Sequence, residues 1–261
     1  MGKTICVSNR KGGVGKTMTA VSLGVGLAKS GASVLLLDAD PQHSLTISLG
    51  VREPDKLPVT LTTAMDAILR ETPIDPTSGI LHHSEGIDFL PANNSLSGTE
   101  LALASVMVGR ETILRQYIDT LKPMYDFVIV DTSPSLGLLT INALTASDCV
   151  LIPVIAGYLD AKGLELLLKT ISQVQRHFNP NLAIGGILLT MVDKRMNYTR
   201  EIISLIESAY GSDIHIFRER IPRSVRAAET SAEGKSIFAY DPTGKVAAAY
   251  ATLTEEVLKI A

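Results

Sequence analysis

The chain has 261 residues, a net charge of −3 and 46% hydrophobic, 20% charged and 5% aromatic residues. This composition suits a globular protein with an aliphatic core, and the charge argues against non-specific nucleic-acid binding by the molecule as a whole. Two cysteines, Cys6 and Cys149, are too few for a disulfide framework or a structural zinc site. The N-terminus is too short and mixed for a signal peptide, and no run approaches the roughly 20 apolar residues that span a bilayer, so we expect a cytosolic protein.

Short apolar runs alternate with longer segments of helical periodicity. This pattern predicts a single α/β domain over residues 1–261, with a mostly parallel sheet flanked by helices on both faces. The expected strands are Thr4–Ser8, Ser33–Asp38, Ile87–Leu90, Phe127–Asp131, Cys149–Val154 and Ile184–Met191. The expected helices are Lys16–Ser30, Leu61–Glu71, Leu96–Leu121, Leu138–Ala146, Ala161–Phe178, Tyr198–Tyr210 and Gly244–Ile260. Polar, turn-rich sequence predicts surface loops at Arg52–Pro58 and Thr72–Glu85.

A glycine-rich turn follows the first expected strand and opens the first expected helix, which is the context of a P-loop. Its glycines let backbone N–H groups point at phosphate oxygens, and the helix N-terminus adds partial positive charge. Lys16 is expected at the β- and γ-phosphates, and the Thr17 hydroxyl can ligate Mg²⁺. Arg10 occupies the place of the usual first glycine. The candidate nucleotide-binding residues here are Lys11, Gly12, Gly13, Val14, Gly15, Lys16, Thr17 and Met18.

Acidic residues follow two other expected strands. Asp38 and Asp40 lie in the segment Asp38-Ala39-Asp40-Pro41-Gln42, and Asp131 ends a hydrophobic run. Open α/β sheets bind ligands at the carboxyl ends of their strands, so these carboxylates are expected beside the phosphate site. An acid there can hold Mg²⁺, often through water, or position a water molecule for attack. The candidate metal-site residues are Thr17, Asp38, Asp40 and Asp131.

The run Lys11-Gly12-Gly13-Val14-Gly15-Lys16-Thr17 resembles the deviant Walker A loop of the ParA/MinD family of ATPases, and more closely its ParA/Soj-type DNA-partitioning members. The resemblance implies ATP and Mg²⁺ as ligands and slow hydrolysis of ATP to ADP and phosphate. It makes Lys11 a lysine that reaches the nucleotide of the other subunit and Lys16 the ordinary P-loop lysine. Asp40 would orient the attacking water, with Asp38 as a supporting outer-shell acid, so that Lys11, Lys16 and Asp40 are the candidate catalytic residues.

The same resemblance identifies Thr132–Ser135 as switch II. The family often has two prolines here, and this chain has Ser133-Pro134-Ser135, a difference that affects loop stiffness more than chemistry. It also makes Met191, Asp193 and Pro222 candidate contacts of the adenine base. An ordinary strand end and turn is the alternative explanation for each of these three residues taken singly.

The region Lys194–Arg226 carries seven basic and four acidic residues within a chain of negative net charge. Basic residues gathered on one face would bind DNA phosphates without sequence preference, although a solvated charged face is the alternative. In ParA proteins, arginines at the positions of Arg195 and Arg226 line a dimer-dependent DNA surface, and Arg223 lies beside them in sequence. These three are the candidate DNA-binding residues.

The resemblance therefore implies a homodimer in the ATP state that binds non-specific double-stranded DNA on the nucleoid. A ParB-like centromere-binding protein would stimulate hydrolysis, and the cargo would be a plasmid or a chromosome. Only ten residues precede Lys11, so we expect no N-terminal helix-turn-helix domain. A MinD-like or scaffold-positioning ATPase is the alternative, but residues 250–261 hold two acids and one lysine, a poor match to anionic lipid, so we expect no membrane partner. A metabolic ligase of the superfamily stays open, and the cysteines do not suit an iron–sulfur cluster between subunits.

Overall fold

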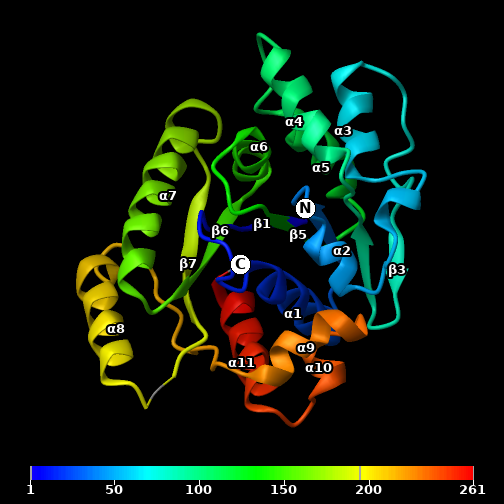
Figure 1. Cartoon of the computed structure of the whole chain (residues 1–261). Helices are drawn as coiled ribbons and strands as arrows, with labels where there is room; N and C mark the ends of the chain where they lie inside the picture. The colour runs from blue at the N-terminus through cyan, green and yellow to red at the C-terminus, as the bar shows by residue number, and fades with distance from the viewer. Residues whose placement is uncertain (1, 194, 261) are drawn as a thin grey trace.

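The computed structural model of the chain describes residues 2–193 and 195–260. Its strands form one seven-stranded sheet in the order β3-β4-β2-β5-β1-β6-β7 (Figure 1). Every neighbouring pair is parallel except β3 with β4, so the mostly parallel sheet predicted from the sequence is confirmed. The strands are β1 (Lys3–Val7), β2 (Val34–Ala39), β3 (Leu81–His83), β4 (Ile87–Leu90), β5 (Phe127–Thr132), β6 (Cys149–Ile155) and β7 (Ala183–Thr190).

Helices cover both faces of the sheet, as Figure 1 shows. One face packs against α1 (Lys16–Lys29), α2 (Ser44–Ser48), α9 (Val225–Glu233), α10 (Ile237–Tyr240) and α11 (Lys245–Ile260). The other packs against α3 (Leu61–Leu69), α4 (Leu96–Ser105), α5 (Ile113–Leu121), α6 (Leu138–Ala146), α7 (Tyr158–His177) and α8 (Asn197–Tyr210). In the described parts of the chain, no helix combines the length and apolarity needed to cross a membrane.

The central strand β2 shows why apolar residues run consecutively along these strands. All six of its residues are buried. Successive side chains of a strand point to opposite faces. Leu35 and Leu37 therefore belong to the core beneath α3–α8, whereas Leu36 belongs to the core beneath α1 and α11. A strand covered on both faces needs apolar residues at every position, not at alternate ones.

The structure corrects three expectations about local structure. The single helix expected over Leu96–Leu121 is wrong, because α4 and α5 are separated by residues 106–112, where Gly109 has a left-handed φ of 83°. The segment Thr72–Glu85 is not all loop, since it contains β3, which exists only by pairing with β4. The segment Arg52–Pro58 contains a short 3₁₀ helix, Pro54–Lys56.

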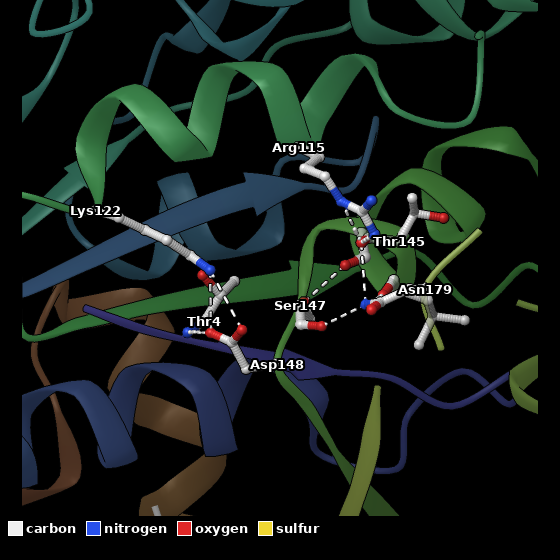
Figure 2. A network of polar contacts seen from close by, with 9 residues as sticks. Thr4, Arg115, Lys122, Thr145, Ser147, Asp148 and Asn179 are labelled. Atoms are coloured by element: carbon white, nitrogen blue, oxygen red, sulfur yellow. Dashed lines mark hydrogen bonds and ion pairs between the residues drawn. The ribbon is translucent and has the colours of Figure 1, made fainter. Parts of the chain in front are cut away.

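At the amino edge of the sheet, a polar network joins segments that are distant in sequence (Figure 2). The carboxylate of Asp148 accepts the backbone N–H of Thr4 at 2.7 Å and the amine of Lys122 at 3.2 Å. Beside it, Nδ2 of Asn179 donates to the carbonyls of Leu144, Thr145 and Ser147. Arg115 from α5 also donates to the carbonyl of Thr145. This network fixes the C-terminal end of α6 at the amino edge of the sheet. The candidate site lies at the opposite, carboxyl edge.

Candidate nucleotide-binding site

The loop between β1 and α1 is tied to β6 and β7 by side-chain hydrogen bonds near its two ends. Asn9 donates through Nδ2 to the carbonyl of Pro153 at 2.7 Å and accepts the backbone N–H of Lys11 at 3.0 Å. The hydroxyl of Thr190 donates to the carbonyl of Val14 at 2.8 Å. Gly15 is the N-cap residue of α1 and has a φ of 87°, a left-handed conformation that favours glycine. The loop therefore has a fixed shape, with the N-terminus of α1 at its end.

Lys16 begins α1 and is only 7% exposed. Its amine donates to the carbonyl of Lys11 at 3.1 Å, across the turn of the loop. Burial lowers the pKa of Lys16, although the nearby carboxylates of Asp131 and Asp40 act in the opposite direction. A phosphate group at this position would add negative charge and favour the protonated amine. The loop thus holds one buried cation that lacks a direct carboxylate partner among the described residues.

Thr17 and Asp131 form a second part of the site. The Thr17 hydroxyl donates to Oδ2 of Asp131 at 2.6 Å, while Oδ1 of Asp131 is buried and has no hydrogen-bond partner among the described residues. Burial raises the pKa of Asp131 well above its ordinary value, and the adjacent carboxylate of Asp38 raises it further. A hydroxyl beside a carboxylate oxygen without a partner is the ligand set that Mg²⁺ prefers. The residues present therefore fit a magnesium ion.

Asp38 and Asp40 have different surroundings. Asp38 is fully buried, and its Oδ2 accepts the backbone N–H and the hydroxyl of Thr46 at 2.8 and 2.6 Å. Its Oδ1 accepts the backbone N–H of Asp40 at 3.2 Å. Burial raises the pKa of Asp38 to about 6 despite these bonds. The geometry makes Asp38 a residue that positions Asp40 and α2, because its oxygens face protein donors.

Asp40 lies at the cavity beside the loop. This cavity has a volume of about 380 Å³ and also brings Gln42 and Pro134 to the P-loop. Oδ1 of Asp40 accepts the backbone N–H of Gln42 at 2.9 Å, so the segment after β2 holds the carboxylate in place. The cavity is lined by Gly12, Gly13, Gly15, Lys16, Thr17, Met18, Asp40, Gln42, Ser44, Pro134 and Met191. Four separate segments of the chain therefore converge on one space beside Lys16.

A second cavity of about 580 Å³ adjoins the first, and the two share five lining residues: Gly15, Thr17, Met18, Ser44 and Met191. Pro222 and Arg223 line it, whereas Asp193 does not. Oδ1 of Asp193 instead accepts the backbone N–H of Arg195 at 3.0 Å. Of the three residues expected at the adenine base, the structure therefore brings Met191 and Pro222 to the cavity next to the P-loop.

Sequence reasoning missed several residues of this larger cavity. α2 contributes Ser44 and Ile47, α9 contributes Thr230, and α11 contributes Tyr250. The hydroxyl of Tyr250 and that of Thr19 are 3.1 Å apart, which ties α11 to α1. These residues come from helices whose packing on α1 has no local signal in the sequence. The one sequence feature that points to this cavity is the proline-containing turn Ile221–Arg223, which precedes α9.

The candidate DNA-binding arginines, Arg195, Arg223 and Arg226, are all exposed. Arg195 follows the end of β7, and Arg223 follows a short parallel bridge between Val192 and Pro222. Arg226 lies in the first turn of α9. Lys194, which the sequence places beside Arg195, lies outside the described residues.

Comparison with known proteins identifies the family of this chain. A family model described as an AAA domain, AAA_31, matches residues 2–184. The sporulation initiation inhibitor protein Soj of Bacillus subtilis is 40% identical over 262 residues, which cover 98% of each chain. The chromosome partitioning protein ParA of Myxococcus xanthus is 38% identical, over 99% of this chain and 89% of that protein.

The chain belongs to the ParA/Soj family of chromosome-partitioning ATPases. A solved structure, cobyrinic acid a,c-diamide synthase of Mycobacterium smegmatis, superposes on this ParA/Soj-family chain with a TM-score of 0.85 at 35% identity. The match covers 99% of this chain and 95% of that one. That protein was crystallised with ADP and magnesium and with an ATP analogue and magnesium. The P-loop fold expected from the sequence is therefore confirmed, and the roles of individual ParA/Soj site residues follow below as proposals.

Proposed function

We propose that this ParA/Soj-family protein hydrolyses ATP slowly, dimerises in its ATP state, and in that state binds double-stranded DNA without sequence preference. A ParB-like centromere-binding protein would stimulate hydrolysis, and the cycle would partition a plasmid or a chromosome on the nucleoid. The observation that carries the proposal is one cavity at the P-loop that is lined by the buried Lys16, by Asp40 and by Thr17, whose hydroxyl donates to the carboxylate of Asp131 behind it.

Each of these groups suits one task in phosphoryl transfer to water. Lys16 would neutralise the β- and γ-phosphates, and backbone N–H groups of residues 12–17 would bind their oxygens. Thr17 and Asp131 would hold Mg²⁺, which supplies charge stabilisation at the phosphates when bound. Asp40 lies at the cavity and would orient the attacking water, with its direction set by Gln42 and by Asp38. A single orienting acid, with no arginine among the described residues that line the smaller cavity, fits slow turnover.

Lys11 supports the dimer part of the proposal. Lys11 is half-buried at the start of the loop, and its backbone carbonyl accepts a hydrogen bond from the amine of Lys16. In a dimer closed over two nucleotides, Lys11 would bring a second cation to the partner's terminal phosphate. Such a dimer would form more readily with ATP than with ADP, because only ATP carries the phosphate that both lysines contact.

The positions of the arginines support coupling of DNA binding to the nucleotide. Arg195 and Arg223 lie within five residues of Thr190 and Ile221, which line the larger cavity. Exposed arginines bind phosphates independently of sequence and lose affinity as salt rises. These arginines therefore suit DNA as a partner. A membrane is a poorer match, because residues 250–260, the segment that would lie on lipid, carry only one lysine.

The direct test is co-sedimentation with duplex DNA of arbitrary sequence in ATP, in ADP and without nucleotide, at about 100 and 300 mM salt. We expect DNA binding only with ATP, weakened at least tenfold at the higher salt. Asp40→Ala should retain ATP and DNA binding while hydrolysis becomes undetectable. A variant with Arg195→Glu and Arg226→Glu should lose DNA binding and keep ATP binding.

Three results would contradict the proposal. Unchanged DNA affinity of the double arginine variant would place the DNA surface elsewhere. ATP-dependent sedimentation with liposomes, in the absence of any DNA binding, would favour the membrane-positioning alternative. Parental hydrolysis by Asp40→Ala would assign the attacking water to another residue.

A further inference from the structure

Arg226 is engaged within its own chain by the turn that follows α10. Its Nε lies 3.4 Å from Oδ2 of Asp241, and its Nη2 donates to the carbonyl of Tyr240 at 3.4 Å. The guanidinium carbon lies 5.3 Å from the centre of the Tyr240 ring, within the range of a cation–π contact. Ring, carbonyl and carboxylate therefore all act on one exposed arginine.

The carboxylate of Asp241 is the more enclosed of the two partners. Its side chain is only 19% exposed, whereas that of Arg226 is 58% exposed. The backbone N–H of Gly244 donates to the carbonyl of Asp241 at 2.9 Å, and a Cβ added at Gly244 would clash with Oδ2 of Asp241. Asp241 is thus packed against Gly244, while the more exposed Arg226 is the partner that a phosphate can reach from solvent.

A second acid contacts the hydroxyl of the same ring. The hydroxyl of Tyr240 donates to Oε2 of Glu229 at 2.8 Å, and Glu229 lies one turn after Arg226 on α9. This hydrogen bond raises the pKa of Tyr240 and holds the ring that lies under the guanidinium. Arg226 consequently contacts one acid directly, Asp241, and a ring that is held by a second, Glu229.

The other two candidate DNA-binding arginines differ in this respect. Among the described residues, neither Arg195 nor Arg223 makes an ion pair. A phosphate that contacts Arg226 must compete with Asp241 for the same guanidinium, whereas a phosphate at Arg223 meets no such competitor.

We propose that Asp241 restrains DNA binding by neutralising Arg226, so that DNA engages Arg226 only by displacing this carboxylate. The inference rests on the proposed DNA-binding function and adds a regulatory contact to the same surface. Exposed ion pairs are weak, so the restraint is a matter of a few-fold and sets the salt at which DNA is released. A weak restraint suits a protein that must leave DNA repeatedly.

The experiment compares Asp241→Asn with the parent, both carrying Asp40→Ala to block hydrolysis, by DNA titration with ATP and Mg²⁺ from about 50 to 300 mM salt. Asparagine keeps the shape of aspartate and an oxygen that accepts from Arg226, so it removes the charge and leaves the orienting contact. We expect DNA affinity to rise about twofold to fivefold, and the slope of log affinity against log salt to steepen by about one. Asp119→Asn removes the same charge from an exposed position of α5, on the other face of the sheet, and should change neither quantity.

A second pair of variants isolates the contact itself. With Arg226→Gln in place, Asp241→Asn should no longer raise DNA affinity, because the charge it unmasks is absent. Tyr240→Phe keeps the ring under the guanidinium and removes the bond to Glu229, so it should have a smaller effect than Asp241→Asn. Thermal melting and ATP affinity should be equal in all variants, which confirms that they fold.

The possible results separate this inference from the proposed function. If the parent binds DNA and Asp241→Asn leaves affinity unchanged or lowers it, the restraint is refuted and the DNA-binding function stands. If affinity rises equally in the Arg226→Gln background, the rise comes from the overall loss of one negative charge, and the restraint is also refuted. If neither the parent nor Asp241→Asn binds DNA, both proposals fail together.

Discussion

The Thr17 hydroxyl donates to Oδ2 of Asp131 at 2.6 Å, although the two residues are 114 positions apart. Thr17 lies in the first turn of α1, and Asp131 lies in β5, which pairs with the strand that leads into the loop. Parallel pairing of β1 with β5 therefore brings a hydroxyl and a carboxylate together at the carboxyl edge of the sheet. The oxygen of Asp131 that Thr17 does not contact is buried without a partner among the described residues, and it is the atom most in need of a cation.

Asp131→Asn should remove the magnesium response without weakening the fold. Asparagine retains an oxygen that accepts from Thr17, and it avoids burying a carboxylate whose pKa burial already raises. We expect Mg²⁺-dependent ATP affinity to fall about 10- to 100-fold, while the melting temperature without nucleotide and metal is unchanged or higher. Titration of a fluorescent ATP analogue with Mg²⁺ and with EDTA measures the first quantity. Equal tightening by Mg²⁺ in both proteins would show that Asp131 does not serve the metal.

Lys16→Ala and Lys11→Ala should impair different steps. Lys16 is the buried cation of the loop, so its loss should reduce ATP affinity at least about 100-fold, which is the loss of a charge-assisted contact in a desolvated site. Lys11→Ala should leave ATP affinity within about threefold of the parent and prevent ATP-dependent dimerisation, because its proposed contact is in the partner subunit. Light scattering coupled to size-exclusion chromatography, with hydrolysis blocked by Asp40→Ala, measures the dimer. A parental dimer in Lys11→Ala would assign the second cation to another residue.

The P-loop and the acidic strand ends were predictable because their signals are local. The glycines, Lys16 and Thr17 lie in six consecutive residues, and Asp131 ends an unbroken apolar run. The break between α4 and α5 was not predicted, because residues 106–112 are apolar enough to continue a helical pattern and only the backbone reveals the left-handed Gly109. β3 has three residues and forms by pairing, a long-range event that three residues cannot signal.

The lining of the larger cavity and the hydrogen bonds between Thr46 and Asp38 could not be predicted from the sequence, for a similar reason. The larger cavity joins Met18, Ser44, Pro222 and Tyr250, whose proximity depends on α9 and α11 packing on α1. The hydrogen bonds from Thr46 to Asp38 span eight residues and require a five-residue helix, α2, that has almost no periodicity to detect. Tertiary packing therefore decided whether Asp38 faced the cavity or the protein interior.

Thr46→Val tests the positioning role assigned to Asp38. The Thr46 hydroxyl donates to Asp38 and accepts the backbone N–H of Ala92 at 3.0 Å, so valine leaves two buried polar groups with fewer partners. We expect a loss of about 2–4 kcal/mol in the free energy of unfolding, measured by urea denaturation. Hydrolysis at saturating ATP should also fall, because Asp40 loses a fixed neighbour. Thr46→Ser keeps the hydroxyl and should recover most of both quantities; equal losses in the serine variant would attribute the effect to the methyl group.

Asn179→Ala should destabilise the protein without touching the nucleotide site. Three carbonyls near the end of α6 lose the amide of Asn179, which Figure 2 shows beside Thr145 and Ser147. Thr145 keeps Arg115 as a donor and Leu144 keeps the backbone N–H of Ser147, whereas the carbonyl of Ser147 keeps neither. We expect a loss of about 2–4 kcal/mol in the free energy of unfolding. ATP affinity of the folded protein should be unchanged, because the network lies at the amino edge and the P-loop at the carboxyl edge. Gln175→Ala removes a single hydrogen bond, to the carbonyl of Leu182, and should cost less than half as much free energy of unfolding. Equal unfolding midpoints in urea for the two variants would show that the contacts of Asn179 do not stabilise the end of α6.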